Sequence, residues 1–182
     1  MNTKTQKKMI KVRFKAIQGV HGFYTVMIFL VLWGLGTYVL VEMIGDRTDK
    51  GPPYWLAIPA FVSLGVSKLI AYYIFADYYE FSYEENKLII RKEDNILQQI
   101  PIQYINNVRF SYELSCYASN MIIHMNDNKI GFAMGGIATS KKDTIKAKYL
   151  ITEKLKPILL ENSFQENIIE KGEDITYEYV KL

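Results

Sequence analysis

Four residues in the second half of the chain supply the types needed for hydrolysis. His124, Asp127 and either Ser111 or Ser119 would give a base, an orienting carboxylate and a nucleophile. Neither serine lies in the glycine-flanked turn that exposes a hydrolase nucleophile. A histidine in a strand-like segment is more often a packed or surface residue. The sequence therefore predicts that this protein is not an enzyme.

Other patterns that carry chemistry are also incomplete. The glycine-rich stretch 131–136 lacks the lysine and the following helix start of a phosphate-binding loop. Cys116 is the only cysteine, which excludes an internal disulfide and a cysteine-based metal cluster, and it has no basic neighbours to activate its thiol. The only other histidine, His21, lies far from His124 in sequence. We expect no metal site and no cofactor.

Lys68 is the single charge in the apolar run 53–76. A charge within a membrane span is costly and often marks a functional site. Lys68 lies about two helical turns from the end of the run, where a lysine stem can extend its ammonium to the interface. The alternatives are pairing with a partner helix and a role in transport, and the lack of another buried charge disfavours transport. Lys68 is a candidate membrane or partner contact.

Small residues follow one face of the same run. Ser63, Ser67 and Ala71 recur every four residues, so they lie along one side of a helix. Small residues at this spacing allow two membrane helices to approach closely. They pack either the two apolar runs against each other or this chain against a second copy or a partner's helix.

Basic residues outnumber acidic ones in the helix predicted after residue 140. Lys142 and Lys146 are its candidate contact residues. They belong either to a solvated face or to a surface held against the anionic inner leaflet.

The elements that would position these residues begin with two apolar runs. Residues 23–41 carry no charge, and residues 53–76 carry only Lys68. A bilayer core requires about 20 apolar residues of helix, and an apolar segment in lipid must satisfy its own backbone hydrogen bonds. The first run is too long for the apolar region of a signal peptide, and no small-residue cleavage pattern follows it. We predict a transmembrane hairpin over residues 19–76, with spans at about 20–43 and 54–76.

The charges around the runs predict their orientation. The basic residues before the first span have no acidic residue among them, and they are Lys4, Lys7, Lys8, Lys11, Arg13 and Lys15. Basic residues close to a span stay in the cytoplasm, and the loop 45–53 is nearly neutral. We expect a basic cytoplasmic N-terminus over 1–18 and a multi-pass protein of the inner membrane with both termini in the cytoplasm. Because topology explains these charges, nucleic-acid binding is disfavoured.

A second pattern begins at residue 77. Tyr79, Phe81 and Tyr83 alternate with polar residues, which is typical of a half-buried strand. Further short strands are expected at 87–92, 96–102, 108–112, 121–125 and 129–132. Ser140 and Asp143 have capping-box spacing before an amphipathic helix that Pro157 must kink or end.

The predicted fold class is therefore an α+β membrane protein. It comprises the hairpin, a cytoplasmic antiparallel sheet domain over 77–162 capped by the C-terminal helix, and a polar tail over 163–182. Residues 175–182 of the tail alternate like a strand, and they either add an edge strand or stay loose.

Three motifs carry a resemblance to a family. They are the tyrosine-rich strand near residue 79, Leu88-Ile89-Ile90, and Ile100-Pro101-Ile102-x-x-Ile105-x-x-Val108. Over residues 75–160 the chain resembles small bacterial pleckstrin-homology-like (PH-like) domains attached to paired membrane helices. Family members often have a glycine turn where this chain has residues 115–119. The resemblance implies a binding or scaffolding module and no reaction.

Two functions fit these observations. The first is a membrane-anchored module that recruits or regulates a protein partner at the cytoplasmic face of the inner membrane. The alternative is an immunity-type protein that neutralises a membrane-targeting or pore-forming toxin. In both, the lipid bilayer is one partner, and a protein partner or a second copy binds through the transmembrane helices.

Overall fold

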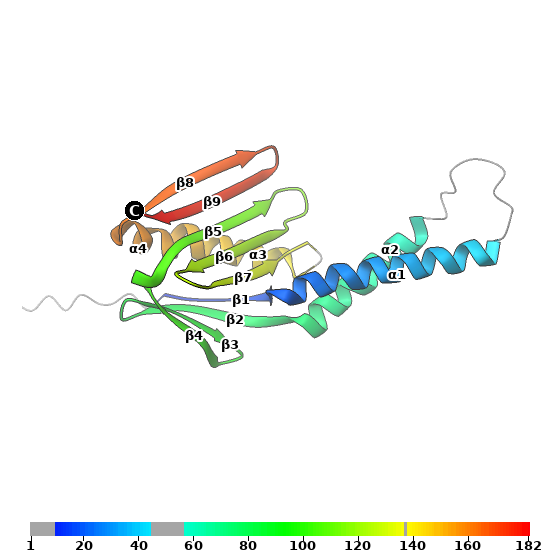
Figure 1. Cartoon of the computed structure of the whole chain (residues 1–182), viewed down its shortest axis with the longest axis horizontal. Coiled ribbons are helices and arrows are strands. Elements are labelled where there is room, and N and C mark those ends of the chain that lie inside the picture. Colours follow the sequence, from blue (N-terminus) through cyan, green and yellow to red (C-terminus); the bar gives the residue numbers. More distant parts are fainter. Residues whose placement is uncertain (1–9, 45–56, 137) are drawn as a thin grey trace, which may run out of the picture.

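Two apolar helices form an antiparallel rod that projects from a sheet domain (Figure 1). The computed structural model describes residues 10–44, 57–136 and 138–182. The expected basic residues at positions 4, 7 and 8, the loop 45–53 and the start of the second span at 54–56 lie outside the described residues. The rod consists of α1 (Val20–Ile44) and α2 (Ala57–Ile70), and the π-helical turn η2 (Ala71–Phe75) continues α2.

The described strands form one nine-stranded antiparallel sheet, in the order β4-β3-β2-β1-β7-β6-β5-β9-β8. Together with the helices, this sheet confirms the α+β class. The strands are β1 (Ile10–Gln18), β2 (Ala76–Glu84), β3 (Lys87–Lys92), β4 (Asn95–Pro101), β5 (Ile105–Glu113), β6 (Ser119–Met125), β7 (Lys129–Met134), β8 (Phe164–Lys171) and β9 (Asp174–Lys181). A short 3₁₀ turn, η3 (Ile102–Tyr104), joins β4 to β5.

The first strand is the main difference from the sequence-based expectation, which placed residues 1–18 outside the domain. β1 pairs with β2 from Ile10 opposite Tyr83 to Ile17 opposite Ala76. Its last residues also pair with β7, with Ile17 opposite Ala133. Phe14 is fully buried, so β1 contributes to the core as well as to the hydrogen bonding of the sheet. The sheet domain is therefore built from residues on both sides of the hairpin.

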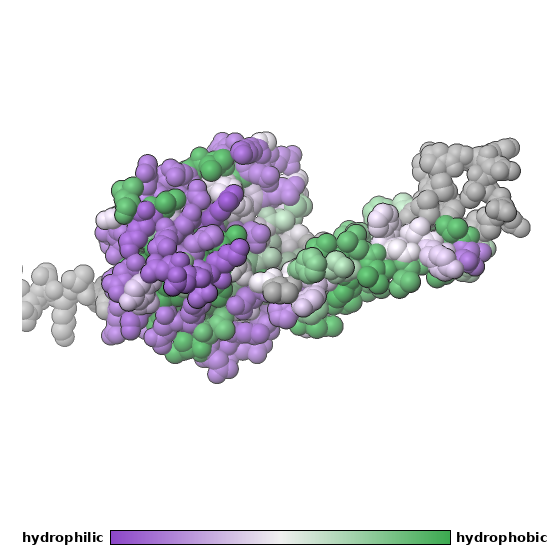
Figure 2. Space-filling model, in the orientation of Figure 1, coloured by the Kyte–Doolittle hydropathy of each residue, from purple (hydrophilic) through white to green (hydrophobic). Residues whose placement is uncertain are grey.

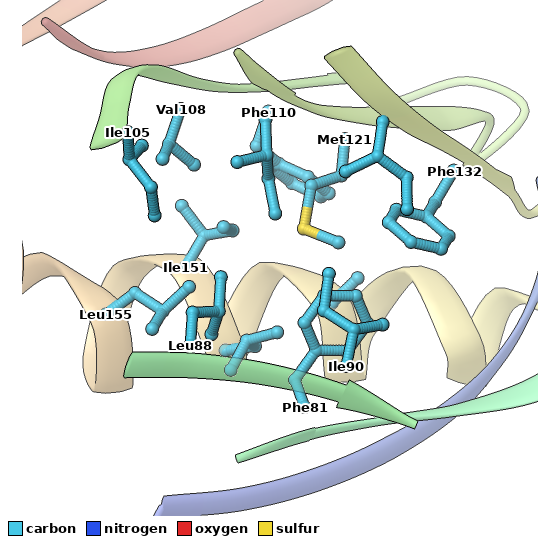
Figure 3. Packing of buried hydrophobic residues seen from close by; sticks show 14 of the residues in the cluster. Phe81, Leu88, Ile90, Ile105, Val108, Phe110, Met121, Phe132, Ile151 and Leu155 are labelled. Atoms are coloured by element: carbon cyan, nitrogen blue, oxygen red, sulfur yellow. The ribbon is translucent and has the colours of Figure 1, made fainter. Parts of the chain in front are cut away.

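The sheet bends at β1 and β7, so that its two halves enclose the core. Figure 3 shows Phe81 and Ile90 on one side of the core and Val108 and Phe110 on the other, with Ile151 beside them. A continuous helical segment packs against the core and consists of α3 (Lys141–Tyr149), η4 (Leu150–Leu155) and α4 (Lys156–Glu161).

The start of this helical segment and the change in its winding before Pro157 lie at the predicted residues. The backbone N–H of Ser140 donates to Asp143 Oδ2 at 3.1 Å, as a capping box requires. Pro157 has no N–H for an α-helical hydrogen bond, and the residues before it adopt the wider π-helical pattern. Leu155 on η4 is only 2% exposed, so the predicted apolar face of the helix is docked.

The C-terminal tail forms a hairpin. β9 pairs with β5 along seven residues, and β8 pairs with β9 alone. Of the two possibilities for residues 175–182, the structure therefore contains the added strand. It also contains β8, which the sequence analysis did not predict and which forms one edge of the sheet.

Candidate membrane and partner interface

The surface of the rod is apolar along its length. Exposed fractions reach 62% for Phe23, 59% for Leu35 and 73% for Phe61. Figure 2 shows hydrophobic residues gathered over the rod and hydrophilic residues over the sheet domain. The 25 residues of α1 extend for about 37 Å at ~1.5 Å per residue, against a bilayer core of about 30 Å. By length and composition, both helices can cross a membrane.

The small residues Ser63 and Ser67 of α2 are buried within the hairpin. Ser63 is 4% exposed and Ser67 is fully buried, whereas Ala71, the first residue of η2, is fully buried in a cluster with residues of the sheet domain. The helices approach closely, since a Cβ added at Gly36 of α1 would lie 3.1 Å from Cβ of Pro59 of α2. Such close contact requires small residues at the helix interface. Of the face predicted to contact a second helix, Ser63 and Ser67 are therefore covered within the hairpin, and Ala71 is covered at the junction with the sheet.

The hairpin and the sheet share an apolar junction. Ile17, Ala71, Ala76 and Ala138 form a buried cluster separate from the main core, and Phe75 packs against it. β2 starts at Ala76, directly after the last residue of η2. The domain is thus attached to the hairpin by packed strands, with no linker between them.

Lys15 forms contacts across this junction. Its Nζ donates to the carbonyl oxygen of Tyr72 at 2.5 Å and lies 3.6 Å from the centre of the Tyr72 ring. Its backbone N–H donates to Oδ1 of Asp143 at 2.8 Å. A cation near the carbonyl end of a helix is stabilising. Lys15 therefore connects β1 to the end of the second apolar helix and to the start of α3.

Lys68 is exposed on α2, beside the sheet domain. It lines a pocket of about 350 Å³ between α2 and loops of the sheet domain. The other lining residues are Tyr72, Cys116, Tyr117, Gly136, Thr139, Ser140 and Lys141. Lys141 Nζ lies 3.6 Å from the centre of the Tyr117 ring. Loops distant in sequence thus place Tyr117, Ser140 and Lys141 in the same pocket as Lys68.

The two other predicted contact residues are exposed on α3. Neither Lys142 nor Lys146 forms an ion pair with another residue that the structure describes. α3 begins at the hairpin side of the domain and runs away from it (Figure 1), so its first turn lies nearer the rod than its last turn. Lys148 instead faces the sheet and donates to the Tyr112 hydroxyl at 2.8 Å, which raises the pKa of Lys148.

The residues considered for hydrolysis are not brought together. His124 of β6 pairs with Asn107 of β5 and Lys129 of β7. Ser111 of β5 pairs with Asn120 of β6, which lies four residues before His124. Because a strand rises about 3.3 Å per residue, Ser111 is displaced by about 13 Å along the strand direction from His124. Among the described residues, no three His, Cys, Asp or Glu side chains lie close enough to hold a metal ion.

Cys116 is exposed, and its thiol contacts an acidic side chain. The Cys116 thiol donates to Oε2 of Glu113 at 3.1 Å. The hydrogen bonds from Cys116 and from the Ser115 hydroxyl hold the pKa of Glu113 below its usual range.

The two edges of the sheet differ in regularity. β8 pairs with β9 in an unbroken register and exposes Ile168 (52%) and Ile169 (39%). At the other edge, β4 exposes Ile96 (54%), but its pairing with β3 shifts register beside Ile90 and it ends at Pro101. Bulges and prolines are devices that protect sheet edges.

Comparison of the chain with protein family models, curated proteins and solved structures gives no match.

Proposed function

We propose that this protein is a membrane-anchored binding module that recruits or regulates a protein partner at the cytoplasmic face of the inner membrane. The observation that carries the proposal is the insertion of an apolar hairpin between two paired strands. Ile17 lies opposite Ala76, so the chain leaves and re-enters the sheet at neighbouring positions. Such an attachment holds the sheet at a fixed height above the bilayer.

The topology supports a PH-like domain. The first seven strands follow the order β4-β3-β2-β1-β7-β6-β5, and the helical segment after β7 packs against their common core. A bent antiparallel sheet closed by a C-terminal helix is the arrangement expected from the resemblance. The hairpin occupies the connection between β1 and β2. Domains of this kind are generally binding or scaffolding modules.

The proposed orientation rests on charges next to the first helix. Lys11, Arg13 and Lys15 lie on β1, within ten residues of Val20, where α1 starts. Basic residues at this distance from a span favour the cytoplasm. Because β1 and β2 pair, the sheet domain lies on the same side as these residues. Both termini are then cytoplasmic.

The edge of β8 is the proposed site for the partner. An unpaired edge presents a row of backbone donors and acceptors to which an extended segment can add a strand. Ile168 and Ile169 project from opposite faces of this edge, so both faces offer apolar contact. Ile169 also borders a groove of about 390 Å³ whose charged lining residues are Arg109, Glu113, Lys171 and Asp174. We propose that an extended segment of a partner protein occupies this edge.

Co-purification of the full-length chain from native membranes tests this function. Ile168→Asp places a charge on the open edge, and Ile96→Asp is a matched control because Ile96 has nearly the same exposure on the opposite edge. We expect a protein partner with the wild type and the control, and its loss with Ile168→Asp. Full recovery with Ile168→Asp would overturn the edge assignment. Absence of any partner would overturn recruitment, and capture of a pore-forming toxin would favour the immunity alternative.

A further inference from the structure

The pocket that contains Lys68 brings two lysines together from distant parts of the chain. Lys68 comes from α2, and Lys141 is the first residue of α3. Tyr72 and Tyr117 form aromatic walls beside them, and the pocket encloses about 350 Å³. Neither lysine forms an ion pair with a carboxylate in the described part of the chain. The pocket therefore concentrates positive charge.

The polar loops beside Lys68 indicate how deep in the bilayer the pocket lies if the hairpin crosses the membrane, a step that rests on the proposed function. Thr139, Ser140 and Lys141 line the same pocket as Lys68. Loop backbone and hydroxyl groups cannot lie in hydrocarbon, because their hydrogen bonds would be unsatisfied. Tyrosine rings such as that of Tyr72 are typical of the membrane interface. The pocket consequently lies at the level of the lipid headgroups, where phosphate groups are abundant.

We propose that this junction pocket binds a phosphate group, with Lys68 and Lys141 as its charged ligands. Ammonium groups form strong charge-assisted hydrogen bonds with phosphate oxygens. The Thr139 hydroxyl accepts the N–H of Gly135 at 2.9 Å, and as a hydroxyl it also has one hydrogen to donate. The Ser140 hydroxyl is engaged, since it donates to Asp143 at 2.6 Å. The source of the phosphate is either an anionic phospholipid or the free ion.

The acidic residues near the pocket in sequence are directed elsewhere. Asp143 accepts hydrogen bonds from the backbone of Lys15 and from Ser140. Glu113 accepts the Ser115 hydroxyl and the Cys116 thiol. Neither carboxylate lines the pocket. The lysines therefore remain available to an external anion.

The test uses full-length protein in nanodiscs that contain phosphatidylcholine and phosphatidylglycerol, with native mass spectrometry of the lipid that the protein retains. Lys68→Gln and Lys141→Gln should each reduce retained phosphatidylglycerol by about fivefold, the factor for ~1 kcal/mol per lysine near an anionic surface. Lys129→Gln is the control, because Lys129 is exposed at the start of β7 and does not line the pocket. It should retain as much lipid as the wild type.

A second arm distinguishes the phosphate source. Inorganic phosphate is added to protein in phosphatidylcholine nanodiscs, and a rise in melting temperature that requires both lysines would identify the free ion as the occupant. Equal lipid retention by all variants, without any phosphate effect, overturns the pocket. Vesicle flotation reports membrane insertion separately. Failure to float overturns the proposed function, whereas normal flotation with lysine-independent retention overturns only the pocket.

Discussion

Ile17 of β1 lies opposite Ala76 of β2, and both side chains belong to the apolar cluster that joins the sheet to the hairpin. The antiparallel strand pair therefore continues directly into the antiparallel helix pair. Lys15 reinforces this continuity through its hydrogen bond to the carbonyl of Tyr72. A displacement of the helices would consequently be transmitted to the centre of the sheet.

The pairing of β1 with β2 makes the topology prediction more specific. Because β1 and β2 pair, the proposed crossing predicts that both ends of the hairpin lie on one side of the membrane and that residue 50 is accessible from the other. Reporter fusions at Lys50 and Leu182 should give opposite signals, and a fusion at Asn128 in the β6–β7 turn should match Leu182. Equal signals at Lys50 and Leu182 would show that the hairpin does not cross.

Gly135 should be the least replaceable glycine of the sheet domain. Its φ is +67°, and a Cβ at this position would overlap the carbonyl oxygen of Tyr117 and the hydroxyl of Thr144. Gly172 is a matched control with φ +62° and open space around it. Gly172→Ala should cost about 1–2 kcal/mol of left-handed strain, and Gly135→Ala clearly more. Melting temperatures of the full-length variants measure the difference, and equal losses would contradict it.

Local pattern was enough to predict most of the sheet. The alternation around Phe81 and the helix start at Ser140 both correspond to observed elements. These features depend on neighbours within a few residues. The turn residues Glu85 and Asn86 adopt positive φ, as a tight hairpin connection requires.

β1 has the same alternating pattern, but membrane topology also explains its basic residues. Its apolar residues Val12, Phe14 and Ala16 alternate with basic residues, which is the period of a strand with one buried face. The two explanations are compatible, because a basic strand next to a span can serve both folding and orientation. Its partner β2, however, lies beyond the whole hairpin. Local pattern does not reveal a pairing over that distance.

In the candidate site, too, features set by the local sequence could be predicted, whereas contacts between distant segments could not. The four-residue spacing of Ser63 and Ser67 located a packing face, but only tertiary structure shows that α1 covers it. The charge of Lys68 was evident in the sequence, whereas the approach of the loop at Tyr117 and of Lys141 was not. Which surfaces meet depends on how the sheet bends and where the hairpin is inserted.

Acid should weaken the contact between the C-terminal hairpin and the helical segment. Burial raises the pKa of Glu166, but hydrogen bonds from Lys156 at 2.7 Å and Tyr179 at 2.8 Å, and the charge of Lys156, outweigh it. The net result is a folded-state pKa below the ordinary value of 4.5. This stabilisation is therefore present above pH 4.5 and is lost as the pH falls through the folded-state pKa.

Glu166→Gln should consequently lower the melting temperature at neutral pH and flatten its decline between pH 5 and pH 3, a range about the ordinary glutamate pKa. Glu170→Gln removes a charge from the same strand at an exposed position and serves as the control. Thermal unfolding followed at several pH values measures both variants. An unchanged acid profile for Glu166→Gln would show that this carboxylate does not couple folding to pH.

The final prediction concerns what the sheet domain needs in order to fold. Since Ile17 and Ala76 are register partners, a two-residue Asn-Gly turn in place of residues 18–75 should close β1 onto β2 as an ordinary hairpin. We expect this shortened chain to be soluble and to unfold in a single cooperative transition. Residues 76–182 alone should not fold, because β2 and β7 are neighbours only through β1.

The energetics favour this outcome. Phe14 and Ala16 are fully buried in the main core, and truncating one buried phenylalanine typically costs about 3–5 kcal/mol. Losing the entire strand removes more than that from a domain whose total stability is typically about 5–15 kcal/mol. Circular dichroism and size-exclusion chromatography compare the two chains, and Phe14→Ala in the shortened chain should lie between them. Cooperative unfolding of residues 76–182 would show that the sheet forms without the strand that precedes the membrane hairpin.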